Sequence, residues 1–172
     1  MGLTKKGEAV NKTNVLFLCT SNSARSQMAE ALLRKYAGDQ FEVYSAGLEP
    51  KGINPYTVRV MNENGIGISG QWSKDVREYM GKKHFGYLIT VCHNAEERCP
   101  TTFPGISRRL HWAFEDPAAF RGSEEDTLAV FRKVRDQIAE RIRSWLAEQG
   151  IAIDPVINRS SPALDGADIK PG

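Results

Sequence analysis

Apolar residues recur along this chain with two alternating spacings. Short apolar runs are typical of strands buried on both faces of a sheet, and they occur at residues 15–18 (VLFL), 41–45 (FEVYS) and 87–91 (YLITV). Helical spacing, with Pro55 as a start signal and Gly150 as a stop signal, predicts helices over residues 26–36, 55–63 and 124–149. A fourth strand is expected near residues 111–114.

This alternation of strands and helices predicts an α/β fold. We expect a single-domain, three-layer structure in which a four-stranded parallel sheet carries helices on both faces. The domain is expected over residues 14–149, between a flexible leader at residues 1–13 and a C-terminal tail at residues 150–172. The apolar stripe of the last helix predicts core packing, and its basic residues are expected to face solvent: Arg132, Lys133, Arg135 and Arg143.

Composition narrows the class of protein. The 172 residues are 41% hydrophobic and 26% charged, and the net charge is +2, which gives no indication of a nucleic-acid or membrane partner. No apolar run is long enough to span a bilayer, and the polar N-terminus lacks the apolar core of a signal peptide. We therefore expect a cytoplasmic protein, with a monomer as the default.

The cysteine content agrees with a reducing compartment. Three cysteines, Cys19, Cys92 and Cys99, do not make the framework of a secreted disulfide-rich protein. Free thiols are expected there, and any disulfide is expected to be transient and catalytic.

The segment C-T-S-N-S-A-R-S, called here the anion loop (residues 19–26), follows the first apolar run. Its small residues let backbone N–H groups curl inward around an anion: Thr20, Ser21, Asn22, Ser23 and Ala24. The following helix adds its positive N-terminal end. Arg25 supplies a planar fork for two oxygens of a tetrahedral oxyanion.

Cys19 is the expected nucleophile at the bottom of this loop. The helix dipole and Arg25 are expected to lower its pKa, so that the thiol is a thiolate at neutral pH. Ser26 is expected to hydrogen-bond the thiolate and to cap the helix.

The stretch VLFLCTSNSARSQMAEALLR resembles the first strand, phosphate loop and first helix of the low-molecular-weight tyrosine phosphatase fold. Within that fold, the motif C-T-x-N-S-x-R-S-Q-M-A-E is more similar to the arsenate reductases than to the phosphatases proper. The resemblance covers about residues 14–148, through YSAGLEPKGINP, TVCHNAEERCP, HWAFEDPA and FRKVRDQI. One departure is Ala24, since many relatives have a cysteine at that position.

Cys92 and Cys99 flank the segment HNAEER, which can form one or two helical turns. Two regular turns separate Cα atoms by more than the ~7 Å limit for a disulfide. A bond between these thiols therefore requires the helix to bend or unwind, which fits catalysis better than a structural bridge.

The resemblance implies a three-cysteine relay. Cys19 attacks arsenate, Cys92 then attacks Cys19 and releases arsenite, and Cys99 attacks Cys92. It implies thioredoxin as the electron donor for the final disulfide, although mycothiol- or glutaredoxin-linked relatives share the fold. Phosphate and sulfate are expected as substrate analogues, and no bound cofactor is expected.

The resemblance also assigns Asp116, in the sequence Glu115-Asp116-Pro117, as a general acid for the leaving oxygen. Phosphatases of this family often continue with tyrosine, whereas this chain has Ala118, which argues against a tyrosine phosphatase.

Asn22, Glu30 and Ser45 match residues that bind a potassium ion in some relatives. Asn22 is alternatively only a brace for the loop. The resemblance places Lys74 at a further ligand position, where its ammonium would replace potassium, but a shift of one residue would place Asp75 there.

Two other functions remain open at this point. A phosphoester hydrolase needs Cys19, Arg25 and Asp116 but not the other two thiols. A redox- or oxyanion-sensing module could use the thiols but would not need Asp116.

Overall fold

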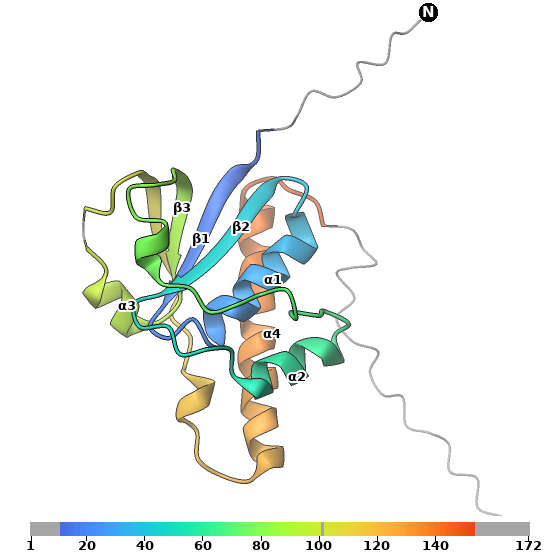
Figure 1. The fold of residues 1–172 in the computed structure, drawn as a ribbon. Coiled ribbons are helices and arrows are strands. Elements are labelled where there is room, and N and C mark those ends of the chain that lie inside the picture. The colour runs from blue at the N-terminus through green and yellow to red at the C-terminus, as the bar shows by residue number, and fades with distance from the viewer. Residues whose placement is uncertain (1–10, 101, 154–172) are drawn as a thin grey trace, which may run out of the picture.

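The computed structural model describes residues 11–100 and 102–153. Four strands form one sheet in the order β2-β1-β3-β4, and all neighbours pair in parallel. The strands are β1 (Thr13–Cys19), β2 (Phe41–Gly47), β3 (Phe85–Thr90) and β4 (Ile106–His111). The α-helices are α1 (Arg25–Ala37), α2 (Pro55–Glu63), α3 (His93–Arg98) and α4 (Glu124–Glu148), with 3-10 turns η1 (Val76–Glu78) and η2 (Pro117–Ala119) (Figure 1). The predicted α/β fold is confirmed.

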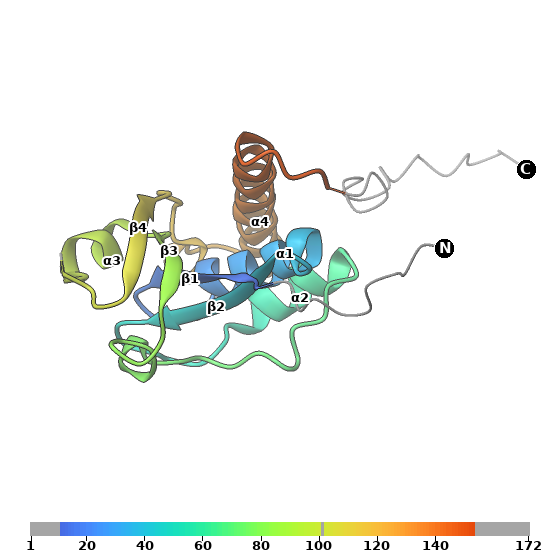
Figure 2. The same ribbon diagram turned by 90° about the horizontal axis from the view of Figure 1, so that it is seen from above.

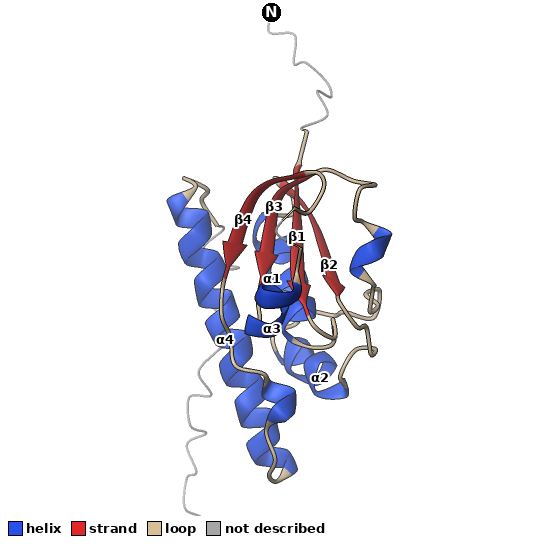
Figure 3. Ribbon diagram, turned by 90° about the vertical axis from the view of Figure 1, so that its left-hand side faces the viewer, coloured by secondary structure: helices blue, strands red, loops and turns tan. Residues whose placement is uncertain are grey.

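The helices form two outer layers. α1 and α4 pack together over one face of the sheet, and α2 packs against α4. α3 and η1 lie toward the opposite face (Figure 2). All four strands point the same way, so their carboxyl ends share one edge (Figure 3). Ligand sites of open parallel sheets lie at this edge.

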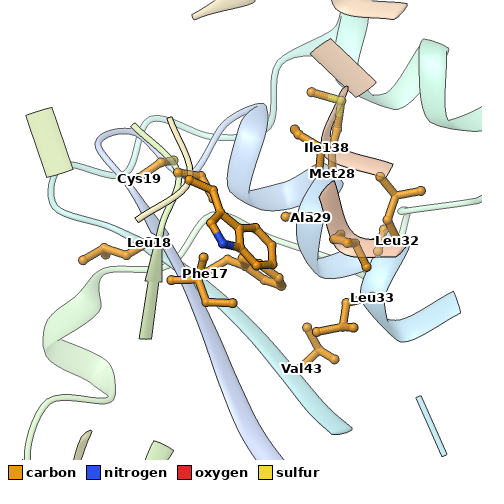
Figure 4. Packing of buried hydrophobic residues seen from close by; sticks show 14 of the residues in the cluster. Phe17, Leu18, Cys19, Met28, Ala29, Leu32, Leu33, Val43 and Ile138 are labelled. Atoms are coloured by element: carbon orange, nitrogen blue, oxygen red, sulfur yellow. The ribbon is translucent and has the colours of Figure 1, made fainter. Parts of the chain in front are cut away.

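The core lies between the sheet and the α1–α4 layer. Residues 15–18 of β1 are completely buried, as expected of a central strand covered on both faces. Phe17 and Val43 face Met28, Leu32 and Leu33 of α1, and Ile138 of α4 closes the same cluster (Figure 4). This packing fixes both ends of the connection between β1 and α1.

β4 shows where the pattern of apolar residues was misleading. The strand spans Ile106–His111 and ends where the prediction near residues 111–114 began. Its sequence ISRRLH is mostly polar because β4 pairs only with β3 at the edge of the sheet. Charged residues are a common protection of edge strands, so an apolar run is absent there.

α4 contains a second difference from expectation. Arg135 is buried, and its guanidinium donates to the Val60 carbonyl and pairs with Glu63. The prediction that it faces solvent was wrong, because the Val60 carbonyl and the partly exposed Glu63 carboxylate of α2 satisfy the charge.

Among the described residues, no helix has the length and apolar character needed to cross a membrane.

The expected leader and the expected tail each lie partly within the described residues. Of the expected leader, residues 1–10 lie outside the described residues, and β1 already begins at Thr13. Of the expected tail, residues 154–172 lie outside them, while Ile151 and Ile153 pack against the core.

Candidate active site

The anion loop joins the end of β1 to the start of α1. Cys19 is the last residue of β1 and Arg25 is the first residue of α1. Asn22 adopts a left-handed backbone conformation (φ 47°), which asparagine tolerates better than most residues. β2 approaches the loop so closely that a Cβ on Gly47 would lie 2.7 Å from the Thr20 carbonyl oxygen. A tight, preformed cradle results.

Asn22 holds the loop in this shape. Its side-chain nitrogen donates to Ser26 Oγ (2.8 Å) and to Ser45 Oγ (2.9 Å). Its side-chain oxygen accepts from Gln27 Nε2 (2.9 Å) and from the Lys74 backbone N–H (2.8 Å). All polar atoms of this buried amide are therefore in use, as the bracing role requires.

Cys19 has two hydrogen-bonding partners within the loop. Its sulfur accepts from the backbone N–H of Asn22 (3.1 Å) and lies 2.8 Å from Ser26 Oγ. Because Ser26 Oγ already accepts from Asn22, its hydroxyl hydrogen is free to point at the sulfur. Ser26 does not cap α1, since the helix begins one residue earlier and has no side-chain cap. The expected capping role was wrong.

The pKa of Cys19 does not follow the expectation. Burial raises the pKa of this thiol above its ordinary value, and Ser26, Arg25 and the Asn22 N–H act in the opposite direction. A charged Cys92 would raise it further. The desolvation of a sulfur held 3% exposed outweighs the loop's favourable contacts. The expected low pKa was therefore wrong.

A cavity of about 250 Å³ opens above Cys19. Its walls are Cys19, Ser21, Ser23, Ala24, Arg25, Lys51, Asp116 and Ala118. Arg25 donates to the Phe114 carbonyl (3.1 Å), and its other terminal nitrogen lies 3.7 Å from Asp116 Oδ2. The structure thus brings the predicted nucleophile, cation and acid together around one cavity that can admit a tetrahedral oxyanion, with no aromatic residue at position 118.

The second thiol reaches the loop from β3. Cys92 caps α3, and its sulfur accepts from the Ala95 N–H (3.3 Å). The same sulfur lies 3.4 Å from Thr20 Oγ1. Asn94 donates to that oxygen (2.9 Å), which leaves the Thr20 hydroxyl hydrogen for the sulfur. Thr20 therefore turns away from the cavity and links the loop to Cys92.

Cys99 lies at the other end of α3. It is buried, and its N–H donates to the Ala95 carbonyl (2.9 Å). Burial raises its pKa, with Arg109 lowering and Glu96 raising it. All three cysteines are free, and the helix between Cys92 and Cys99 is regular.

The residues compared with a potassium site form a cluster behind the loop. Ser45 donates to Glu30 Oε2 (3.2 Å), and the Lys74 ammonium lies 3.8 Å from the same oxygen. Asp75 instead pairs with Arg77. Because a buried ammonium already neutralises Glu30, the cluster does not fit an added potassium ion. Within residues 11–100 and 102–153, no group of His, Cys, Asp and Glu could hold a metal ion.

Sequence reasoning missed two groups of residues. Lys51 lines the cavity, although nothing in its local sequence marks it as a ligand. Gln27 and Asn94 act on the loop through Asn22 and Thr20. Both residues lie in stretches that carry the family resemblance, but the sequence assigns no role to their amides, and only the folded structure shows that they contact the loop.

This fold and cradle define a class of protein. The profile of the low molecular weight phosphotyrosine protein phosphatase family matches residues 14–153. The chain belongs to this family.

Its curated relatives include arsenate reductases. That of Halalkalibacterium halodurans is 47% identical over 141 residues, which cover 82% of this chain and 99% of the relative. That of Bacillus subtilis is 45% identical over 136 residues, covering 79% and 96%. Among solved structures, an arsenate reductase in the phosphate-binding state is 31% identical, with a TM-score of 0.64 over 79% of this chain and 98% of the other. A thioredoxin-dependent arsenate reductase of Corynebacterium glutamicum is 32% identical, with a TM-score of 0.60, over 82% of this chain and 64% of the other.

Proposed function

We propose that this chain is a thioredoxin-coupled arsenate reductase that uses three cysteines in turn. One observation carries the proposal: the sulfur of Cys92 lies 3.4 Å from Thr20 Oγ1, the residue next to Cys19, so a second thiol reaches the anion loop. A hydrolase has no use for this second thiol. The named relatives above are arsenate reductases that match nearly their full length.

The first step builds a covalent adduct. Arsenate binds in the cavity against Arg25 and the loop N–H groups. Cys19 gives its proton to solvent and its thiolate attacks arsenic, and one arsenate oxygen leaves as water after Asp116 gives it a proton. The bound dianion's site also contains Lys51, whose charge favours the same ligand.

The second step is the reduction. The Cys92 thiolate attacks Cys19 Sγ, the sulfur–arsenic bond breaks, and its electron pair stays on arsenic, which leaves as arsenite. A Cys19–Cys92 disulfide remains. Cys99 then attacks Cys92, so the disulfide becomes Cys92–Cys99 and Cys19 returns as a thiolate. Thioredoxin reduces that last bond.

The remaining expectations belong to the same proposal. Lys74 takes the place of a bound cation beside Glu30, so the enzyme works without potassium. All of the reacting groups come from one chain, so a monomer suffices. A cytoplasmic location supplies the reductant that returns the thiols to their free state.

The test is an assay of NADPH oxidation with arsenate, thioredoxin and thioredoxin reductase. We expect arsenate-dependent oxidation by the parent and none by Cys19→Ser or Cys92→Ser. If the parent shows no arsenate-dependent oxidation while remaining folded, the reductase proposal fails.

Phosphoester hydrolysis is a second candidate, favoured by the position of Asp116 in the same cavity as Cys19. It requires no other thiol. Full phosphatase turnover by Cys92→Ser, together with an inactive parent in the arsenate assay, would favour it.

A further inference from the structure

Arg109 of β4 holds the chain on both sides of Cys99. One terminal nitrogen of its guanidinium donates to the Pro100 carbonyl (2.9 Å), immediately after Cys99. The other donates to the Glu96 carbonyl (2.9 Å), one helical turn before it, and lies 3.4 Å from the Glu96 carboxylate. One rigid, planar group therefore fixes the spacing of two carbonyls that bracket a thiol.

A second set of contacts anchors Glu96 itself. Its carboxylate accepts from Thr90 Oγ1 at the end of β3. Thr90 Oγ1 also lies 2.9 Å from His111 Nδ1, and that nitrogen is 3.8 Å from the Glu96 carboxylate. These contacts tie α3 to β3 and β4, so Arg109 is held against a fixed support rather than against a free helix.

Under the proposed relay, this arrangement has to open. A regular helix between residues 92 and 99 separates their Cα atoms by about 10 Å, beyond the disulfide limit. When Cys99 moves toward Cys92, the Glu96 and Pro100 carbonyls change their spacing, and a planar fork cannot follow both. Arg109 Nε is buried without a hydrogen-bond partner among the described residues, so the closed arrangement leaves one donor unused.

We propose that Arg109 is a positioning residue for Cys99: it clasps the Glu96 and Pro100 carbonyls in the reduced enzyme and releases one of them when the disulfide moves. This inference rests on the proposed function, because only the relay requires Cys99 to move. In that step Cys99 gives its proton to solvent and its thiolate attacks Cys92 Sγ. The new bond forms as the Cys92–Cys19 bond breaks, and the electron pair leaves with Cys19.

The clasp also sets the charges around Cys99. Burial raises the pKa of this thiol, the Arg109 charge lowers it, and Glu96 on α3 raises it. His111 lies on the far end of the same network, with its Nδ1 3.8 Å from the Glu96 carboxylate. When Arg109 releases one carbonyl, its positive charge stays near the Cys99 sulfur. Substitution of Arg109 by an uncharged residue removes both the hydrogen bonds to the carbonyls and the positive charge. The two roles are therefore separable by substitution.

The experiment measures alkylation of each cysteine in the full-length, reduced protein. Iodoacetamide is applied over a pH series, and peptide mass spectrometry follows each site, since tryptic cleavage after Arg98 separates Cys92 from Cys99. The variants are Arg109→Gln and Arg109→Lys. Arg108→Gln is the matched control, because Arg108 is exposed and adjacent side chains of a strand point to opposite faces.

We expect Arg109→Gln to raise the limiting alkylation rate of Cys99 at high pH by about tenfold, with the midpoint moved to higher pH. Arg109→Lys keeps the charge but not the fork, so we expect a raised limiting rate with the parental midpoint. A Cys99 rate equal to that of Arg108→Gln would overturn the clasp. An equal rise at Cys19 would also overturn it, because the loosening would then be general. None of these readouts depends on arsenate turnover.

A second measurement follows the relay in a single turnover with arsenate. In Arg109→Lys we expect arsenite release at the parental rate and faster transfer of the disulfide to Cys92–Cys99, detected by the return of the free Cys19 thiol. Unchanged transfer with raised Cys99 alkylation would contradict a role in the relay. Absence of arsenite from the parent would instead be a failure of the proposed function.

Discussion

The anion loop and the thiol segment (residues 92–99) lie at the same edge of the sheet but are built differently. The loop is braced from within by the buried Asn22 amide and is enclosed between β1, β2 and α1. The thiol segment consists of the six-residue helix α3 with a cysteine at each end, and the side chains of Arg109 and Thr90 connect it to β4 and β3. A cradle that stabilises a transition state has to be preformed, whereas a segment that carries a disulfide has to move. The chain thus places the preformed cradle where three elements enclose it, and the thiols that must move on a short helix held by side-chain contacts.

Substitution of Cys99 is expected to have the largest effect, because it affects the thiol segment and leaves the anion loop intact. We expect Cys99→Ser to bind arsenate and release a single equivalent of arsenite, because the loop and Cys92 are intact. Steady-state turnover with thioredoxin is expected to fall more than about a hundredfold. Quantifying arsenite per enzyme in a single turnover, beside the steady-state rate, checks this. Continued rapid turnover would mean that the Cys19–Cys92 disulfide is reduced directly and that the third thiol is dispensable.

Lys74 tests how much the loop depends on its internal support. Lys74→Ala leaves the buried Glu30 carboxylate with Arg34, 3.1 Å from its other oxygen, as its remaining cation, so we expect the free energy of unfolding to fall by about 2 kcal/mol. Urea denaturation measures the loss, and Lys35→Ala, an exposed lysine on α1, is the control. Partial recovery in potassium chloride but not in sodium chloride would place the ammonium in a cation site. No loss of stability would count against a supporting role.

Ser26 tests the electrostatics of the loop without altering the thiol segment. Its hydroxyl lowers the pKa of Cys19 against the larger effect of burial. Ser26→Ala is therefore expected to raise that pKa further and to slow alkylation of Cys19 at neutral pH by about tenfold. The pH midpoint for Cys19 moves upward, and activity is retained only toward alkaline pH. The control is Ser107→Ala on β4, which should leave the pH dependence of Cys19 alkylation unchanged. An unchanged pH dependence in Ser26→Ala would show that the 2.8 Å contact between Ser26 Oγ and the Cys19 sulfur has no influence on the thiol.

Lys51 gives the smallest expected effect. It lines the cavity from the loop after β2, so Lys51→Ala should raise the KM for arsenate about threefold with little change in kcat. The difference from the parent should shrink in high salt, since an exposed charge is screened. Lys82→Ala, an exposed lysine away from the cavity, is the control. A fall in kcat at unchanged KM would instead place Lys51 in the chemistry.

Much of the loop was accessible from sequence. Cys19, Arg25 and the small residues between them are contiguous, and they follow an apolar strand, so local spacing alone placed them at a strand–helix junction. The edge strand was less accessible, because β4 lacks the apolar run of a buried strand. Arg135 was misplaced for a related reason: its partners, Val60 and Glu63, come from a distant helix.

The sequence by itself determined which chemistry the chain can perform. The order of strand, small-residue loop, arginine and helix fixes a backbone shape, and the three cysteines supply a nucleophile and two further thiols. Only the tertiary structure decided how those groups behave. Burial raises the pKa of Cys19 despite its favourable neighbours, Lys74 rather than Asp75 lies beside Glu30, and Arg109 brackets Cys99. Each of these depends on residues brought together from separate elements, and desolvation and hydrogen bonding act across space rather than along the chain.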